Sequence, residues 1–148
     1  MANGVMVSAI DLAWAAGFLD GEACIHIARV KRNCGHGVNY RLRLYVSQNC
    51  LHTLVRLQQI FGGTGYIRQV RRRLEHTRQI YTYSLDGRSA IEAIRAVWPY
   101  LYRKRAEADV ALAFYEDGDI SLHPGPNGTS PAIWAFRKWC YDKLRKMK

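Results

Sequence analysis

Two acidic residues, Asp20 and Glu22, directly follow an apolar stretch and have the clearest potential for chemistry. Ala13, Gly17 and Gly21 recur every four residues there, so one face of the expected helix carries almost no side chains. A face this bare lets a second backbone approach closely. Two such helices packed together would hold their terminal acids side by side, which is one way to set paired carboxylates around metal ions.

A second group of possible ligands consists of two Cys-x-His pairs, Cys34 with His36 and Cys50 with His52. Sulfur and imidazole nitrogen are the ligands that zinc prefers. Their spacing is not that of a usual zinc finger, because one pair falls in an expected turn and the other at a helix start. We therefore expect no zinc site.

The charge of the chain is strongly positive and unevenly distributed. The 148 residues have a net charge of +10, and Glu75 is the only acid between Ala23 and Leu85. Concentrated Lys and Arg release counterions from phosphates, so a polyanion such as DNA or RNA is the expected partner.

Composition also limits the class of protein. A hydrophobic content of 49% is typical of a globular chain with a real core, not a disordered one. No apolar run is long enough for a membrane span, and residues 1–10 lack the pattern of a signal peptide. The four widely spaced cysteines suit reduced thiols. We expect an intracellular protein of the cytoplasm, nucleoid or an organelle matrix, with no membrane partner.

Periodicity predicts one domain over residues 1–148, with a core of about 8–115 and a helical extension of about 131–148. A capping box at Ser8 and Asp11 should open the first helix, and Gly21 should end it. Strands follow from Cys24, then a helix over 51–61, a second hairpin over 66–85, and helices over 89–98 and 103–115, the first opened by a capping box at Ser89. The order αββαββα with appended helices indicates an α+β domain with a four-stranded antiparallel sheet.

The second strand alternates most clearly. Leu42, Leu44 and Val46 share one side, while Arg41, Arg43 and Tyr45 share the other. One face of the sheet should therefore be core and the other cationic and aromatic. On the last strand we expect Tyr81, Tyr83 and Leu85 on the core side, leaving Arg78, Ile80, Thr82 and Ser84 on the cationic side. A shift of one residue would invert this assignment.

The stretch from Ala15 to Ala23, AAGFLDGEA, resembles the nine-residue signature of the LAGLIDADG homing endonucleases. It matches at the central Ala-Gly pair, the apolar pair, both acids and the glycine between them, and departs at its two ends, where leucine and glycine are usual. The order of elements from about Ser8 to Phe114 is similar to that fold as well. A single motif per chain implies a homodimer packed through Ala13, Ala16, Gly17, Asp20 and Gly21.

The resemblance also implies a metal-dependent phosphodiester hydrolase. Such a reaction needs a metal-activated water and stabilisation of negative charge on the phosphate. Glu22 should bind Mg²⁺ with the carbonyl of Gly21 as a second ligand; Mn²⁺ could substitute, and Ca²⁺ could bind without supporting cleavage. Asp20 is as consistent with a structural role at the helix end as with direct chemistry.

The resemblance also implies roles for two further residues, Gln48 and Lys104. Gln48 matches a polar residue that orders water near the metals, and Lys104 matches a basic residue near the scissile phosphate. Arg103 and Arg105 flank Lys104, so the choice among three cations stays open. For His52 a surface role is favoured over that of a general base.

Binding should come from the cationic face of the sheet, since antiparallel strands can lie along the major groove and present alternate side chains to base edges. The expected DNA contacts are Arg41, Arg43, Tyr45 and Arg68, followed by His26, Tyr66, Arg72, Arg78 and Thr82.

The resulting hypothesis is a homing endonuclease that cuts both strands of a long, nearly palindromic double-stranded DNA site and is encoded in a mobile intron or intein. Two alternatives remain open: a maturase that binds intron RNA and assists splicing, and a non-catalytic DNA-binding regulator with the same fold.

Overall fold

Helices and hairpins alternate along the chain, as expected. The computed structural model describes residues 6–31, 37–72, 74–118 and 128–148. The first half contains α1 (Ala9–Glu22), β1 (Ala23–Lys31), β2 (Val38–Gln48) and α2 (Leu51–Ile60). The second half contains β3 (Tyr66–Gln69), β4 (Tyr81–Asp86), α3 (Arg88–Val97), a 3₁₀ turn η1 (Trp98–Tyr100), α4 (Arg105–Glu116) and α5 (Pro131–Lys146). The predicted α+β class and element order are confirmed.

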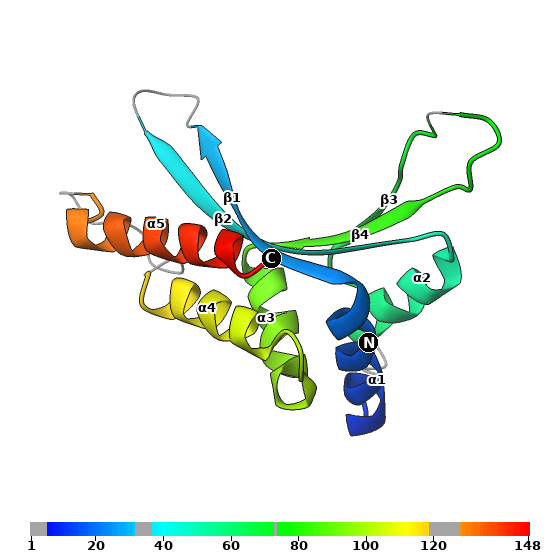
Figure 1. Cartoon of the computed structure of the whole chain (residues 1–148). Coiled ribbons are helices and arrows are strands. Elements are labelled where there is room, and N and C mark those ends of the chain that lie inside the picture. The colour runs from blue at the N-terminus through cyan, green and yellow to red at the C-terminus, as the bar shows by residue number, and fades with distance from the viewer. Residues whose placement is uncertain (1–5, 32–36, 73, 119–127) are drawn as a thin grey trace.

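The four strands form one antiparallel sheet in the order β1-β2-β4-β3. Figure 1 shows that the β1–β2 and β3–β4 hairpins rise on opposite sides of a saddle, while the helices lie beneath it. All five α-helices contact the sheet or one another on that lower side. The upper face of the saddle is therefore free to meet a ligand.

Alternation along the strands creates the two faces. Leu42, Leu44 and Val46 of β2 are buried against the helices, together with Tyr83 and Leu85 of β4. Because Tyr45 pairs with Ser84, and Ser47 with Thr82, these residues share the upper face. The predicted register of β4 is confirmed.

Helix α1 begins as predicted and ends later than predicted. The Ser8 hydroxyl accepts from the Asp11 backbone N–H at 3.1 Å, and the Asp11 carboxylate accepts from the Ser8 N–H at 3.3 Å. The expectation that Gly21 ends the helix is wrong: α1 continues through Glu22, and β1 starts at the next residue. Glu22 therefore sits on the last helical turn and not in a loop.

The predicted capping box at Ser89 is also wrong. Gly87, at a φ of +57°, starts α3 two residues earlier, so Ser89 lies in the first turn. Its hydroxyl donates to the Asp86 carbonyl at 2.9 Å, and Glu92 pairs with Arg88.

The C-terminal helix is part of the core. Cys140 and Leu144 of α5 are buried, and Tyr40 of β2 packs against the rings of Trp134 and Tyr141. The Arg137 Nε donates to the Gly118 carbonyl at 2.7 Å, which ties α5 to the end of α4. Within the described residues, no helix has the length and hydropathy needed to cross a membrane.

Candidate active site and nucleic-acid interface

Glu22 is exposed at the point where α1 passes into β1. None of the described side chains or backbone groups bonds to its carboxylate. The last carbonyls of a helix lack hydrogen-bond donors within the helix. The backbone N–H of Ala23, which follows α1, donates only to the carbonyl of Leu19. The Gly21 carbonyl beside Glu22 thus adds a second hard oxygen donor, and the pair fits the ligand preference of Mg²⁺.

Gln48 lies at the same end of the sheet. Strand β1 begins with Ala23 opposite Val46, and Gln48 is the last residue of β2, two positions beyond that pair. Its side chain is half-buried. The register thus places an amide close to the turn of helix that carries Glu22.

Asp20 connects the end of α1 to the segment between η1 and α4, which is far away in the sequence. One carboxylate oxygen accepts from the Tyr102 backbone N–H at 2.8 Å and the other from the Lys104 N–H at 2.9 Å. Lys104 is the N-cap residue of α4 and is half-buried. Asp20 therefore holds the segment carrying Lys104 against the end of α1, two residues from Glu22.

The structure distinguishes among the three neighbouring cations. Arg105 stacks its guanidinium on the Trp98 ring at 4.3 Å and donates to the carbonyls of Trp98 and Pro99 at 3.0 and 2.9 Å. It is thus committed to holding η1, whereas Arg103 is exposed. Lys104 is the cation whose backbone is fixed to the motif.

The remaining candidate ligands do not form a metal site among the described residues. His52 is exposed on α2, and Cys50 precedes that helix with its thiol accepting from the Thr53 hydroxyl at 3.2 Å. This hydrogen bond lowers the pKa of the Cys50 thiol. Cys34 and His36 lie outside the described residues. Within the described part of the chain, His, Cys, Asp and Glu do not gather in groups of three or more.

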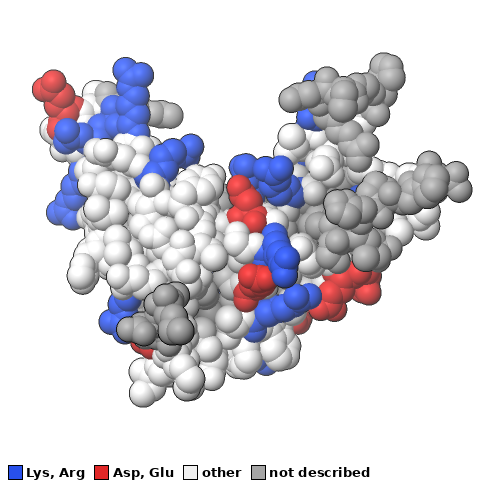
Figure 2. Space-filling model, turned by 180° about the vertical axis from the view of Figure 1, so that it is seen from behind, with Lys and Arg blue, Asp and Glu red and all other residues white. Residues whose placement is uncertain are grey.

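The upper face of the saddle carries most of the expected DNA contacts, and Lys and Arg border the hollow between the hairpins (Figure 2). Cross-strand pairing puts Arg43 opposite His26, and Tyr66 opposite Ser84. The residues that share this face are His26, Arg41, Arg43, Tyr45, Tyr66, Arg68 and Thr82. Arg72 and Arg78 lie exposed beyond the paired strands.

Some of these side chains already have partners. Arg43 forms an ion pair with Asp86 at 2.9 Å, an acid on the upper face that the sequence pattern did not reveal. Thr82 is buried and its hydroxyl shares a 2.7 Å hydrogen bond with Ser47. Arg72 donates to the Glu75 carbonyl at 3.3 Å, which braces the hairpin tip. Arg41 and Arg68 are the freer cations of the face.

Uncharged aromatic side chains lie on the part of the upper face nearest to Glu22. His26 lies edge-on to the Tyr45 ring, with centroids 5.9 Å apart. Burial, followed by the charges of Lys148 and Arg43, lowers the pKa of His26, so the ring is neutral at pH 7 and offers one donor and one acceptor.

The small-residue stripe of α1 is uncovered. A Cβ at Gly17 or at Gly21 would meet nothing within 4 Å, and Ala13 and Ile10 are exposed beside them. Ala16, expected at the dimer interface, is instead fully buried in its own chain because it faces the core with Ala15 and Leu19. The exposed stripe of α1 therefore consists of Ile10, Ala13, Gly17 and Gly21.

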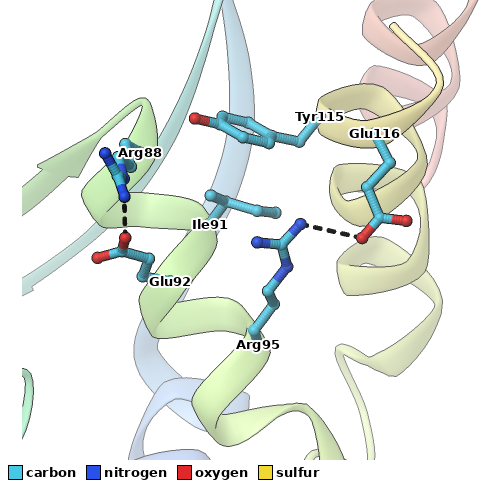
Figure 3. Close-up of a pocket in the computed structure, with 6 residues that line it drawn as sticks. All are labelled: Arg88, Ile91, Glu92, Arg95, Tyr115 and Glu116. Carbon is cyan, nitrogen blue, oxygen red and sulfur yellow. Dashed lines mark hydrogen bonds and ion pairs between the residues drawn. The ribbon is translucent and has the colours of Figure 1, made fainter. Parts of the chain in front are cut away.

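A pocket of about 400 Å³ between α3 and α4 is unrelated to these residues. Figure 3 shows its charges satisfying one another: Arg88 pairs with Glu92 at 3.0 Å, and Arg95 pairs with Glu116 at 2.9 Å. Ile91 and Tyr115 complete the lining. No free charge faces this pocket from these two pairs, so we do not assign the chemistry to it.

The fold and the site together define a saddle-shaped nucleic-acid-binding protein with an unpaired acid, an amide and an amine at its base. The family model of the LAGLIDADG endonucleases matches residues 15–109, so the chain belongs to this family. A comparison with curated proteins finds no match. Membership in the family supports a site-specific DNA endonuclease.

Solved structures of homing endonucleases share the fold. I-CvuI in complex with its target in the presence of calcium is 25% identical, with a TM-score of 0.75 over 94% of this chain and 82% of that chain. The archaeal intron-encoded I-Vdi141I complexed with DNA is 12% identical, with a TM-score of 0.73 over 94% of this chain and 84% of that chain. I-GzeII with its DNA target is 16% identical, with a TM-score of 0.65; the match covers 90% of this chain and 43% of that chain.

Proposed function

We propose that this protein is a homodimeric homing endonuclease that makes Mg²⁺-dependent double-strand cuts at a long, pseudo-palindromic DNA site and is encoded in a mobile intron or intein. The observation that carries the proposal is the exposed, unpartnered Glu22 at the base of a cationic sheet in a chain of this family.

The metal would be held by Glu22 and the Gly21 carbonyl, both oxygen donors at the end of α1. When bound, a divalent ion supplies a more acidic water and charge neutralisation at the phosphate. The complexes of I-CvuI described with calcium and with magnesium support a divalent ion as cofactor. Mn²⁺ is the expected substitute for Mg²⁺.

The protein residues contribute orientation and charge. The Gln48 amide at the end of β2 can accept from and donate to water, and so orient it beside the acid. The Lys104 ammonium supplies positive charge to the phosphate as negative charge develops on its oxygens. The upper face of the sheet binds the duplex, with Arg41, Arg43, Tyr45 and Arg68 as principal contacts.

A second copy would pack on the uncovered stripe of α1. Small residues let two backbones approach, and a two-fold axis would place the two Glu22 side chains near each other. The match to most of I-CvuI but to less than half of I-GzeII supports one copy of the fold per chain here.

Cleavage of a randomised duplex library tests the function. The purified protein should cut a small set of related, nearly palindromic sequences in Mg²⁺ and cut none in EDTA. Sequencing the cut ends gives the site. Failure to cut any member in Mg²⁺ or Mn²⁺ would contradict the proposal.

Replacing Asp20 with alanine should slow cleavage without weakening DNA binding. The change leaves two backbone N–H groups without their acceptor and releases the segment of Lys104, at a cost of about 1–3 kcal/mol in the free energy of unfolding. Because the carboxylate acts through Lys104, the single-turnover rate should fall while the dissociation constant in Ca²⁺ stays unchanged.

Two variants complete this test. Asp20→Asn keeps one acceptor oxygen and should recover part of the rate, whereas Glu92→Ala removes only an exposed ion pair with Arg88 and should change little. Equal rates for Asp20→Ala and the wild type would refute the positioning role.

A further inference from the structure

Helix α5 runs along β1, which is an edge strand of the sheet. Between them lies a groove of about 340 Å³, and Figure 1 shows that the C-terminal end of the chain reaches the base of the saddle beside β1. The groove is lined by His26, Arg29, Arg145 and Lys148 around a floor of Ile27, Tyr141 and Leu144. The lining is cationic and contains no acid.

The end of this groove reaches the upper face. The Lys148 ammonium lies 2.9 Å from the thiol sulfur of Cys24, a residue that pairs with Tyr45 on that face. Cys24 follows Glu22 by only two residues. The Lys148 ammonium therefore lies near Glu22 at the base of the upper face, although α5, which precedes Lys148, packs beneath the sheet.

The positive charge of the groove is not cancelled locally. The nearby acids are already engaged, Asp142 with Lys138 at 2.8 Å and Asp86 with Arg43 at 2.9 Å. Arg145 donates one N–H to the Tyr141 hydroxyl at 3.3 Å. A guanidinium has five N–H donors, so others remain to bind an anion. The occupant that matches this chemistry is an anion with several acceptor oxygens.

We propose that the groove between β1 and α5 binds a backbone phosphate of the DNA, with Arg145 and Lys148 as the contacts. The proposal rests on the proposed function, because the duplex bound on the upper face brings the phosphate to the groove. The groove is continuous with the upper face, because His26 lines the groove and also lies on that face, and this supports DNA as the occupant. Contacts to phosphate fix the position of the protein on the duplex but do not read its sequence.

The salt dependence of binding tests the proposal. The double variant Arg145→Ala, Lys148→Ala is compared with Lys143→Ala, Lys146→Ala, which removes the same charge from other exposed positions of α5. Binding is measured by mobility shift in Ca²⁺ from 50 to 300 mM salt, on the selected site and on a random duplex of equal length. Each lost phosphate contact reduces the slope of log K against log salt by about one.

The Arg145→Ala, Lys148→Ala protein should reduce this slope by about two per subunit and should lose the same factor of affinity for both duplexes. The Lys143→Ala, Lys146→Ala protein should keep the wild-type slope. Equal slopes for the two variants, or a loss confined to the selected site, would overturn the proposal. Circular dichroism of both variants should match the wild type, because all four side chains are exposed. A wild-type protein that binds neither duplex would refute the proposed function itself.

Discussion

Replacing Glu22 with glutamine should abolish cleavage and leave DNA binding intact. Glutamine preserves the size of the side chain and one acceptor oxygen, but it removes the charge that a hard divalent ion requires. A bound metal contributes several kcal/mol to stabilisation of the transition state, and each 1.36 kcal/mol is a factor of ten. We therefore expect a loss of roughly a thousandfold or more in the single-turnover rate in Mg²⁺.

Folding should not confound this result. Glu22 is exposed and bonds to no described group, so its replacement should change the free energy of unfolding by less than about 0.5 kcal/mol. Binding to the selected site in Ca²⁺, measured by mobility shift, should stay close to wild type. Glu92→Gln is the matched control, because Glu92 is exposed on α3 and paired only with Arg88. A Glu22→Gln protein that cuts within tenfold of the wild-type rate would exclude Glu22 as the metal ligand.

Replacing Gly17 with leucine should separate the subunits and stop cleavage while each chain stays folded. Within one chain a side chain at Gly17 meets nothing within 4 Å, and the loss of a helical glycine stabilises the monomer by about 0.8–1 kcal/mol. Between two chains the same side chain would fill the space that the bare stripe leaves. Overpacking costs about 1–3 kcal/mol per site, and the two-fold axis doubles it.

The dimer should accordingly dissociate roughly thirtyfold to twenty-thousandfold more readily. Sedimentation velocity measures the change of species, and circular dichroism confirms that the fold survives. Ala132→Leu, at an exposed position of α5, is the control for adding a large apolar side chain and should remain dimeric and active. A Gly17→Leu protein that is still an active dimer would contradict packing through this stripe.

Local patterns predicted most of the architecture. The period of two in β2 gave both faces of the sheet, and the capping box at Ser8 gave the start of α1, because each signal depends on residues within one element. The two boundary errors, at Gly21 and Ser89, both make a helix too short: α1 continues past Gly21, and α3 begins before Ser89. In α1 the strand starts at Ala23, and in α3 Gly87 takes the cap.

The contacts that assemble the site could not be predicted from such patterns. Asp20 accepts from backbone groups 82 and 84 residues away, and Lys148 reaches Cys24 across 124 residues. Periodicity carries no information about which distant segments meet. The same limit applies to the ion pair of Asp86 with Arg43, which removes charge from a face that looked purely cationic in sequence.

The absence of any linker between α1 and β1 has a consequence for engineering. Glu22 ends the helix and Ala23 starts the strand, so the acid is joined without a break to β1, which carries His26 and pairs with β2 along its whole length. If the proposed roles hold, this junction would fix the distance between the cut and the bases that the sheet contacts. New specificities built by exchanging side chains on the sheet should therefore move the sequence that is recognised and keep the position of the break within it.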